Sequence, residues 1–356
     1  MLYQIDQVAN NARHAGSKAR NDATAILGDM GFKSLRLNCS LNESPMAIAK
    51  DIVSMDLQMR KLFKSMEPNS VAVVQFPYRC FMTSTGKVIR SLADSKSIKC
   101  VALVHDIDSL RRENAESRVG QYSLSEKLHC DCLFLRYFDF VISHNAKMSE
   151  FLAKSGVSPN RIINLELFDY LTEPPCRDQS QLSKNVSVAG NLTEKKAGYL
   201  YSLPKELKGS SLHFDLFGNG YSCESSEDIS YRGSVDPAEL PALLPSGFGL
   251  VWDGPSADCC AGAYGNYLKF NNPHKLSLYY ASGLIPVVWE RSAAAGFVRS
   301  TDSGITVSRI KDLPQAINSL SPEEYKALVG NAAEIGNKVR TGFYLRRATG
   351  EVLSQM

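Results

Sequence analysis

Short apolar runs alternate with amphipathic stretches along the first half of the chain. The apolar runs predict strands, and stretches with apolar residues three or four positions apart predict helices. The predicted strands cover residues 34–37, 70–76, 99–105, 138–143 and 161–165, and the predicted helices cover 12–31, 46–66, 85–94 and 146–155. The run at 99–105 has almost no polar residue, which is typical of a parallel strand covered on both faces. This alternation of strand and helix predicts a doubly wound α/β domain.

The second half of the chain repeats this alternation after a change in composition. Residues 172–183 are rich in Pro, Ser, Gln and Asp, which indicates a linker. Strands are then predicted at 184–189, 212–217, 230–232, 248–253, 284–289 and 304–307, with helices at 193–203, 236–244 and 275–281. A final helical region begins at the capping sequence SPEE at 321–324, with Gly336 and Gly342 as candidate bends.

The two alternating halves predict an α/β fold of two Rossmann-like, doubly wound domains. We expect an N-terminal domain over residues 1–171, a C-terminal domain over 184–335, and a helical tail over 336–356 that packs back on the N-terminal domain. Ligands of such sheets bind beyond the carboxyl ends of the strands. We therefore expect the ligand in a cleft between the two domains.

Composition narrows the classes of function. A length of 356 residues favours two domains over one, and 44% apolar with 22% charged residues is typical of a soluble globular protein. The net charge of +3 is too small for the basic surface of a nucleic-acid binder, but it permits a weak attraction to an anionic membrane.

The sequence also indicates a compartment. The N-terminus lacks the basic segment and the apolar core of a signal peptide, and no apolar run approaches the ~20 residues that span a bilayer. The nine cysteines are irregularly spaced, without a Cys-x-x-Cys pair, and Cys259 and Cys260 are adjacent. This usage indicates free thiols in a reducing compartment, so we expect a cytoplasmic protein.

Residues 248–275 carry the strongest sign of a binding site. A short apolar run turns acidic and glycine-rich at Asp253-Gly254, and a helix then begins within the run YLKFNNPHK at 267–275. A helix start offers free N–H groups and the positive end of the helix dipole, and lysines add full charges. This combination suits a phosphorylated ligand, although a solvated helix start has the same composition. The candidate ligand-binding residues are Asp253, Lys269, Asn271, Asn272, Pro273, His274 and Lys275.

Glycines after two predicted strands are further candidates. Gly190-Asn191 follows the first strand of the second half, where a phosphate or a sugar can approach the backbone, and a tight turn explains the pair equally well. Gly16 and Lys18 follow the expected first strand of the chain, and Lys18 could reach a charged ligand. The run GNG at 218–220 lacks the third glycine of the dinucleotide fingerprint, so it is a weak signal for NAD.

Polar side chains also follow the apolar strand at 99–105. His105, Asp106 and Asp108 lie where this strand ends, so they could accept or orient a proton. Asp106 could instead cap the following helix or pair with the arginines at 111–112. His144, at the end of another strand, is a second candidate, although a hydrogen-bonded structural histidine is more common.

Six segments of the chain together resemble one family. They are HDIDSLR at 105–111, ISHNAKM at 142–148, FDYL at 168–171, AGNL at 189–192, WDG at 252–254 and YLKFNNPHK at 267–275. The chain resembles the β-1,6-galactofuranosyltransferases of bacterial surface-polysaccharide synthesis. It is more distantly similar to the glucosyltransferases that extend glycans on streptococcal adhesins. The resemblance covers nearly the whole chain, and its nine-residue run is specific because such a polar sequence has no reason to recur by chance.

The resemblance implies a GT-B fold, in which the second domain holds most of a nucleotide-sugar donor and no metal is required. It implies an inverting transfer of galactofuranose from UDP-galactofuranose to a saccharide acceptor, with a β-1,6 linkage, in the synthesis of lipopolysaccharide O-antigen or exopolysaccharide. The acceptor is expected to be lipid-linked, at the cytoplasmic face of the membrane. Peripheral membrane contact and a homo-oligomer are further expectations.

The implied transfer reaction assigns roles to the residues named above. Lys269 and Lys275 would neutralise the departing UDP, with the neighbouring asparagines as neutral donors. Asp106 or His105 would take the proton of the acceptor hydroxyl, and the other would orient it. These roles are expectations from the resemblance and from the residue types.

Three other functions fit parts of the pattern. A UDP-glucose-dependent glucosyltransferase that acts on a glycoprotein or glycolipid glycan would have the same architecture. A nucleotide-sugar epimerase needs NAD, and the missing third glycine at 218–220 argues against it. A non-catalytic sugar-binding scaffold would keep the donor site but would release no UDP.

Overall fold

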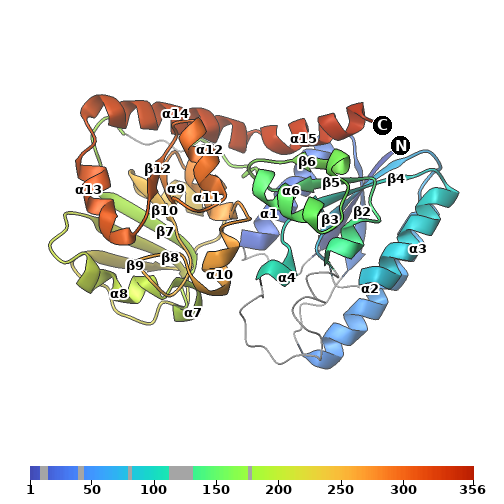
Figure 1. Cartoon of the computed structure of the whole chain (residues 1–356), viewed down its shortest axis with the longest axis horizontal. Helices are drawn as coiled ribbons and strands as arrows, with labels where there is room; N and C mark the ends of the chain where they lie inside the picture. The colour runs from blue at the N-terminus through green and yellow to red at the C-terminus, as the bar shows by residue number, and fades with distance from the viewer. Residues whose placement is uncertain (9–14, 39–43, 79–81, 112–130, 175–178) are drawn as a thin grey trace. The chain divides into compact units, whose positions relative to one another are not determined.

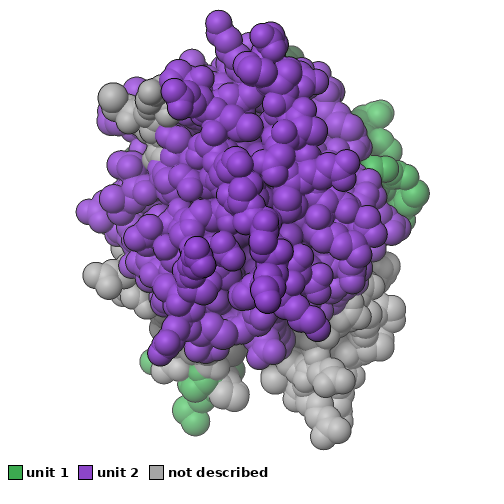
Figure 2. Space-filling view, turned by 90° about the vertical axis from the view of Figure 1, so that its left-hand side faces the viewer, with its two compact units in different colours: residues 1–166, 344–356 green, residues 167–343 purple. Residues whose placement is uncertain are grey.

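The computed structural model describes residues 1–8, 15–38, 44–78, 82–111, 131–174 and 179–356. They form two compact units, coloured separately in Figure 2: unit 1 contains Met1–Glu166 and Tyr344–Met356, and unit 2 contains Leu167–Phe343. The C-terminal stretch 336–356 is therefore divided, because residues 336–343 belong to unit 2 and residues 344–356 to unit 1. The FDYL segment at 168–171 also belongs to unit 2.

Unit 1 is built on a six-stranded parallel sheet in the order β2-β1-β3-β4-β5-β6 (Figure 1). Its strands are β1 (Leu2–Val8), β2 (Lys33–Asn38), β3 (Val71–Phe76), β4 (Lys99–Val104), β5 (Phe140–Ser143) and β6 (Ile162–Asn164). The helices are α1 (Ala15–Asp29), α2 (Pro45–Ser65), α3 (Met82–Ser95), the single turn α4 (Asp108–Arg111), and α6 (Ala146–Lys154). The elements predicted for this half are confirmed, with ends that differ by a few residues.

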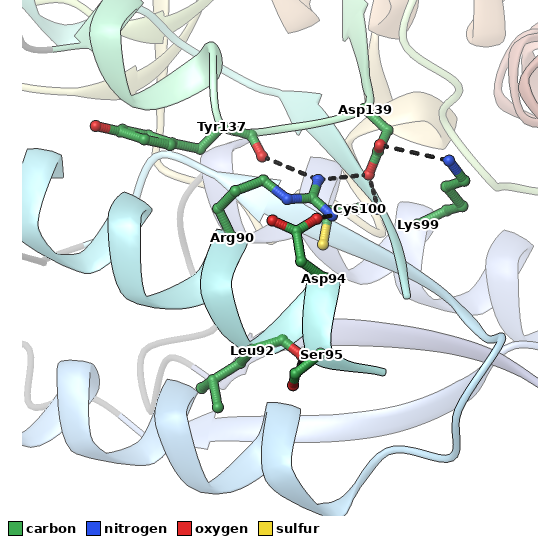
Figure 3. A network of polar contacts seen from close by, with 8 residues as sticks. All are labelled: Arg90, Leu92, Asp94, Ser95, Lys99, Cys100, Tyr137 and Asp139. Carbon is green, nitrogen blue, oxygen red and sulfur yellow. Dashed lines mark hydrogen bonds and ion pairs between the residues drawn. The ribbon is translucent and has the colours of Figure 1, made fainter. Parts of the chain in front are cut away.

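An ion-paired network fixes helix α3 to the starts of β4 and β5 (Figure 3). Asp139, immediately before β5, accepts hydrogen bonds at 2.8 Å from the Arg90 guanidinium and at 2.8 Å from the Cys100 backbone N–H. Arg90 also pairs with Asp94, one turn further along α3, at 2.6 Å. Burial raises the pKa of the Cys100 thiol to about 12, so this thiol stays protonated and unreactive at neutral pH. The network therefore stabilises the amino end of the sheet, away from the edge at which ligands bind.

Two arginines attach the C-terminal helix α15 (Phe343–Ser354) to the rest of unit 1. Arg346 pairs with Asp29 at the end of α1, at 2.9 Å. Arg347 pairs with Glu166 at 2.8 Å and donates to the backbone carbonyl of Leu165 at 2.9 Å. Both guanidinium groups are thus bound to the protein itself.

Unit 2 contains a second six-stranded parallel sheet, in the order β12-β11-β10-β7-β8-β9. Its strands are β7 (Asn185–Asn191), β8 (His213–Asn219), β9 (Ile229–Gly233), β10 (Phe248–Val251), β11 (Ile285–Trp289) and β12 (Ile305–Val307). Its helices are α7 (Glu194–Ala197), α8 (Tyr199–Glu206), α9 (Leu240–Leu243), α10 (Gly262–Tyr267), α11 (His274–Ala281), α12 (Ala294–Ser300), α13 (Leu313–Asn318) and α14 (Pro322–Arg340). All six predicted strands are confirmed, whereas α10, α12 and α13 were not predicted.

The two unit sheets confirm the α/β fold class with doubly wound topology. Three helix predictions need correction. The helix expected at 193–203 is divided into α7 and α8 at Gly198, and the helix expected at 236–244 is reduced to α9. Gly336 does not bend α14, because it lies inside an unbroken helix where a Cβ would stand 2.3 Å from the Tyr280 carbonyl oxygen. Gly342, with φ of +76°, does separate α14 from α15.

Among the described helices, none combines the length and the apolar content that crossing a bilayer requires.

Candidate functional site

The carboxyl edge of the unit 2 sheet holds most of the predicted binding residues. The chain winds from β7 outward through β8 and β9 and then returns to β10 on the other side of β7. The strand order therefore reverses between β7 and β10, and ligands of parallel sheets bind beyond the carboxyl ends at such a reversal. Gly190 and Asn191 end β7, and Asp253 follows β10 by two residues.

A buried tyrosine keeps β7 and β10 from pairing at this edge. The two strands pair over only two positions, the last of them at Gly249. Beyond it, the Tyr279 hydroxyl of α11 accepts a hydrogen bond from the Ala189 N–H at 2.9 Å and donates one to the Leu250 carbonyl at 3.2 Å. The ring lies against Gly249, where a Cβ would stand 2.2 Å from it. The strands thus part towards their carboxyl ends while these backbone groups stay hydrogen-bonded.

Gly190 presents open backbone at the same edge. Its φ is +128°, and no atom of the described residues lies within 4 Å of the position that a Cβ would take. At Gly218, its partner in β8, a Cβ would stand 1.7 Å from the Gly190 carbonyl oxygen, so that glycine serves packing. Asn191 turns the chain, because its side-chain oxygen accepts from the Thr193 N–H at 3.0 Å and from the Thr193 hydroxyl at 2.6 Å. A ligand can therefore approach Gly190, whereas the Asn191 side chain is engaged in the turn.

Lys275 and Asp253 form a largely buried ion pair. The Lys275 Nζ lies 2.7 Å from Asp253 Oδ1 and donates to the Trp252 carbonyl at 3.1 Å. The two side chains are 12% and 8% exposed. The pair ties the start of α11 to the end of β10. Because the two charges compensate each other, Lys275 attracts an anion less strongly than the sequence alone indicates.

Lys269 keeps an uncompensated positive charge. It does not lie at a helix start, as the sequence suggested, but in the turn after α10. Its Nζ donates to the Asn266 side-chain oxygen at 2.9 Å and lies 5.7 Å from the centre of the Trp289 ring. Arg291, just beyond β11, stands with its guanidinium carbon 5.7 Å from the centre of the same ring. Neither cation forms a salt bridge within the described part of the chain, so two positive charges without a carboxylate partner lie near the Trp289 ring, at the carboxyl end of β11.

The other residues of the run at 267–275 pack inward. Asn271 and Asn272 are 8% and 3% exposed, and the Asn271 side-chain oxygen has no hydrogen-bond partner among the described residues. Pro273 holds extended backbone immediately before α11. His274 stacks on Tyr170 with 4.9 Å between ring centres, and its Nε2 lies 3.3 Å from the carbonyl oxygen of the residue before that tyrosine. His274 therefore joins the FDYL segment to α11, and the Asn271 amide is the group that a ligand could satisfy.

The first turns after β1 in unit 1 hold two more candidates. The strand order of this sheet reverses between β1 and β3, so its ligand edge is expected there. Gly16 lies in the first turn of α1. Lys18 follows it, and its Nζ lies 2.5 and 2.6 Å from the two carboxylate oxygens of Asp22. The charge of Lys18 is therefore compensated within its own helix.

His105 and Asp106 are each held by a neighbour at the carboxyl end of β4. His105 Nε2 lies 2.9 Å from the side-chain oxygen of Gln75, whose Nε2 donates to the Thr24 hydroxyl of α1 at 2.9 Å. Asp106 accepts a hydrogen bond from the Arg111 guanidinium at 2.9 Å, which was one of the sequence-based alternatives. The Asp106 side chain is still 31% exposed, so a substrate hydroxyl can reach its carboxylate.

Asp108 is the first residue of α4 and is partly buried. Together with Asp106 it gives two carboxylates in an Asp-x-Asp spacing. In the part of the chain that the structure describes, no three His, Cys, Asp or Glu side chains gather as a metal site would require.

His144 cannot act on a substrate directly. Its ring, one residue beyond β5, is 1% exposed. Burial lowers its pKa to about 4, against the effect of hydrogen bonds with the backbone of His105 and Val104. The ring is therefore neutral at pH 7 and out of reach of an acceptor hydroxyl, which fits a structural histidine under the strand end that carries His105.

Two residues at the carboxyl edge of the unit 2 sheet were not predicted from the sequence. Arg291 follows an apolar strand just as Asp253 does, so a search for charged residues after every predicted strand would have found it. Tyr279 carries no such signal, because an aromatic residue on an apolar helix is usually a core residue. Only its two hydrogen bonds reveal its position between the strands.

Comparisons with known proteins agree with this architecture. Models of the N-terminal and C-terminal domains of Glucosyltransferase 3-like proteins match residues 3–167 and 186–352. The β-1,6-galactofuranosyltransferase WbbI of Escherichia coli (strain K12) is 31% identical over 361 residues, which cover 100% of this chain and 99% of that protein. Glucosyltransferase 3 of Streptococcus gordonii is 22% identical over 94% of each chain. The crystal structure of Anabaena HepE in complex with UDP and glucose is 11% identical and matches 100% of both chains with a TM-score of 0.58.

Two Rossmann-like units and these relationships define a glycosyltransferase of the GT-B fold. The chain belongs to the family of WbbI and the Glucosyltransferase 3-like proteins. The resemblance that six short segments indicated is thereby confirmed along the full length of the chain.

Proposed function

We propose that the protein transfers galactofuranose from UDP-galactofuranose to a saccharide acceptor, with inversion at the anomeric carbon and a β-1,6 linkage. The full-length identity to WbbI supports the sugar and the linkage. The observation that carries the donor assignment is the pair of uncompensated cations, Lys269 and Arg291, at the carboxyl edge of unit 2. The complex of HepE with UDP and glucose supports a UDP-sugar as well. The acceptor in this proposal is lipid-linked, at the cytoplasmic face of the membrane, and serves O-antigen or exopolysaccharide synthesis.

The proposed reaction needs a proton acceptor and a stabilised leaving group. The acceptor oxygen forms a bond to C1 of the sugar while the bond from C1 to the UDP oxygen breaks. Asp106, held by Arg111, takes the hydroxyl proton, and Lys269 and Arg291 neutralise the charge that develops on UDP. Gly190 lets the donor approach the backbone closely.

Because protein cations supply this charge, we propose that no metal ion is required. The Asp-x-Asp spacing at Asp106 and Asp108 makes a direct test necessary. The transfer rate should be the same in EDTA as in Mg²⁺ or Mn²⁺. A rate that collapses in EDTA and returns with a divalent ion would contradict metal independence.

A donor panel tests the sugar. UDP-galactofuranose, UDP-galactopyranose and UDP-glucose are each supplied with a saccharide acceptor, and products are identified by mass and by linkage analysis. Galactofuranose transfer is expected to dominate. The similarity to Glucosyltransferase 3 makes glucose transfer to a glycoprotein or glycolipid glycan the competing outcome. Donor binding with no UDP released and no product formed would instead indicate a non-catalytic scaffold.

Removing the Lys269 charge should weaken UDP binding. A charge-assisted hydrogen bond contributes about 1.5–3 kcal/mol, so Lys269→Ala should raise the Kd for UDP roughly 10- to 150-fold in isothermal calorimetry. The matched control is Lys208→Ala, which removes the same charge from an exposed position in unit 2. An unchanged Kd in Lys269→Ala would remove this lysine from the diphosphate site.

A further inference from the structure

Helix α2 exposes an apolar surface that the described residues of unit 1 leave uncovered. Met46, Val53 and Leu57 are 84%, 49% and 54% exposed. They account for three of the seven large apolar side chains that are exposed among the described residues. Their spacing places them on one side of the helix. Grouped apolar exposure of this kind marks a binding surface rather than an ordinary solvated face.

Lysines extend this side of the helix. Lys50, Lys61 and Lys64 are exposed and, with the three apolar residues, follow one another at intervals of three and four positions. Together these six residues, 46, 50, 53, 57, 61 and 64, form the α2 stripe. The two acidic residues of α2, Asp51 and Asp56, are buried, with 6% and 8% exposed, and do not belong to the stripe. The α2 stripe therefore carries the positive charges of its lysines and includes no acidic residue of α2.

The opposite side of α2 is firmly packed. Met55, Met59 and Phe63 are fully buried in unit 1. The carboxylate of Asp56 accepts a hydrogen bond from the Thr85 hydroxyl of α3 at 2.6 Å, and α2 lies along α3 in Figure 1. The α2 stripe is thus presented by an anchored helix, and its exposure does not arise from a loose segment.

We infer that the α2 stripe binds the surface of an anionic lipid membrane. A helix with apolar side chains flanked by lysines inserts its apolar groups at the headgroup level while the lysines contact anionic headgroups. A second copy of this chain is a poorer partner, because a self-complementary contact through this stripe would bring lysines against lysines. The inference rests on the proposed function in one respect: a lipid-linked acceptor explains why this enzyme would bind such a membrane.

Vesicle co-sedimentation of the full chain tests the inference without any transfer reaction. The protein should sediment with vesicles of mixed phosphatidylglycerol and phosphatidylcholine, far less with phosphatidylcholine alone, and less at high salt. Each lysine near an anionic surface strengthens partitioning about fivefold. The triple variant Lys50→Gln, Lys61→Gln, Lys64→Gln should therefore lose at least tenfold in binding. The triple variant Met46→Gln, Val53→Gln, Leu57→Gln should lose binding to a similar degree, and glutamine preserves helix propensity.

The matched control removes three exposed lysines from unit 2, Lys205, Lys208 and Lys326, and should bind vesicles like the wild type. Circular dichroism and transfer to a soluble saccharide acceptor, measured on every variant, separate loss of fold or of activity from loss of lipid binding. The inference is overturned if the control and the stripe variants bind vesicles equally. It is also overturned if sedimentation velocity shows that the apolar variant dissociates a dimer while vesicle binding stays unchanged.

Discussion

Replacing Asp106 by asparagine should reduce the transfer rate about 10²- to 10⁴-fold while UDP binding stays intact. This is the range that a positioned general base contributes, and the amide cannot take the acceptor proton. The carboxylate suits the role because Arg111 holds one oxygen at 2.9 Å while the side chain remains partly exposed. Steady-state kinetics with saturating donor, together with calorimetric UDP binding, measures both quantities.

Asp29→Asn is the matched control for this variant. Asp29 is also an aspartate of unit 1 that pairs with an arginine, Arg346, at 2.9 Å. Its replacement should leave the rate unchanged, since it lies at the end of α1 and not at a strand end. If Asp106→Asn behaved like this control, Asp106 would be a structural ion pair and the base would have to be sought elsewhere, first at His105.

Acidification below pH 6.5 should destabilise the protein through His144. Burial lowers the pKa of this histidine from its ordinary value of 6.5 to about 4. Between these values the unfolded chain binds a proton that the folded chain does not, so the free energy of unfolding falls as pH decreases from 6.5 towards 4. The expected loss from this group is about 3 kcal/mol, and it is complete below pH 4. Denaturant unfolding at a series of pH values measures it.

The variant His144→Leu separates this effect from that of the carboxylates. It should show a flatter dependence of unfolding free energy on pH between 6.5 and 4 than the wild type. Equal slopes in the wild type and His144→Leu would show that His144 does not titrate as a buried group.

The spacing of apolar residues and the polarity of each segment were sufficient to predict most of the fold. Most strands of the two sheets follow from short apolar runs, because a parallel strand buried on both faces has few polar positions. Strand β1 is an exception, because its sequence LYQIDQV contains three polar residues. The capping box at Ser321 and Glu324 fixes the start of α14, with bonds of 3.2 and 2.8 Å. Helices α10, α12 and α13 escaped prediction because they have only six, seven and six residues, which is too short to show a clear amphipathic period.

The candidate site was predicted less completely, since local sequence does not show how charges pair. Lys269 and Lys275 look equivalent in the sequence, yet Lys275 pairs with Asp253, whereas Lys269 has no carboxylate partner among the residues that the structure describes. Lys18 likewise looks available until its contact with Asp22 is known. Which polar residues lie at a strand end can be read from the pattern, but which of them keep a free charge depends on neighbours that are distant in sequence.

Gly249 and Tyr279 constrain each other in any future change to this sequence. A side chain at position 249 has no room while the tyrosine ring stands 2.2 Å from its Cβ position. If residue 279 became small, the backbone groups of Ala189 and Leu250 would lose their shared partner, and β7 and β10 could pair further along their length. The two positions must therefore be altered together, and a redesign that enlarged the first and reduced the second would close the edge where the open backbone of Gly190 lies. An enzyme engineered for a different donor sugar should keep this glycine and this tyrosine and vary the residues around them.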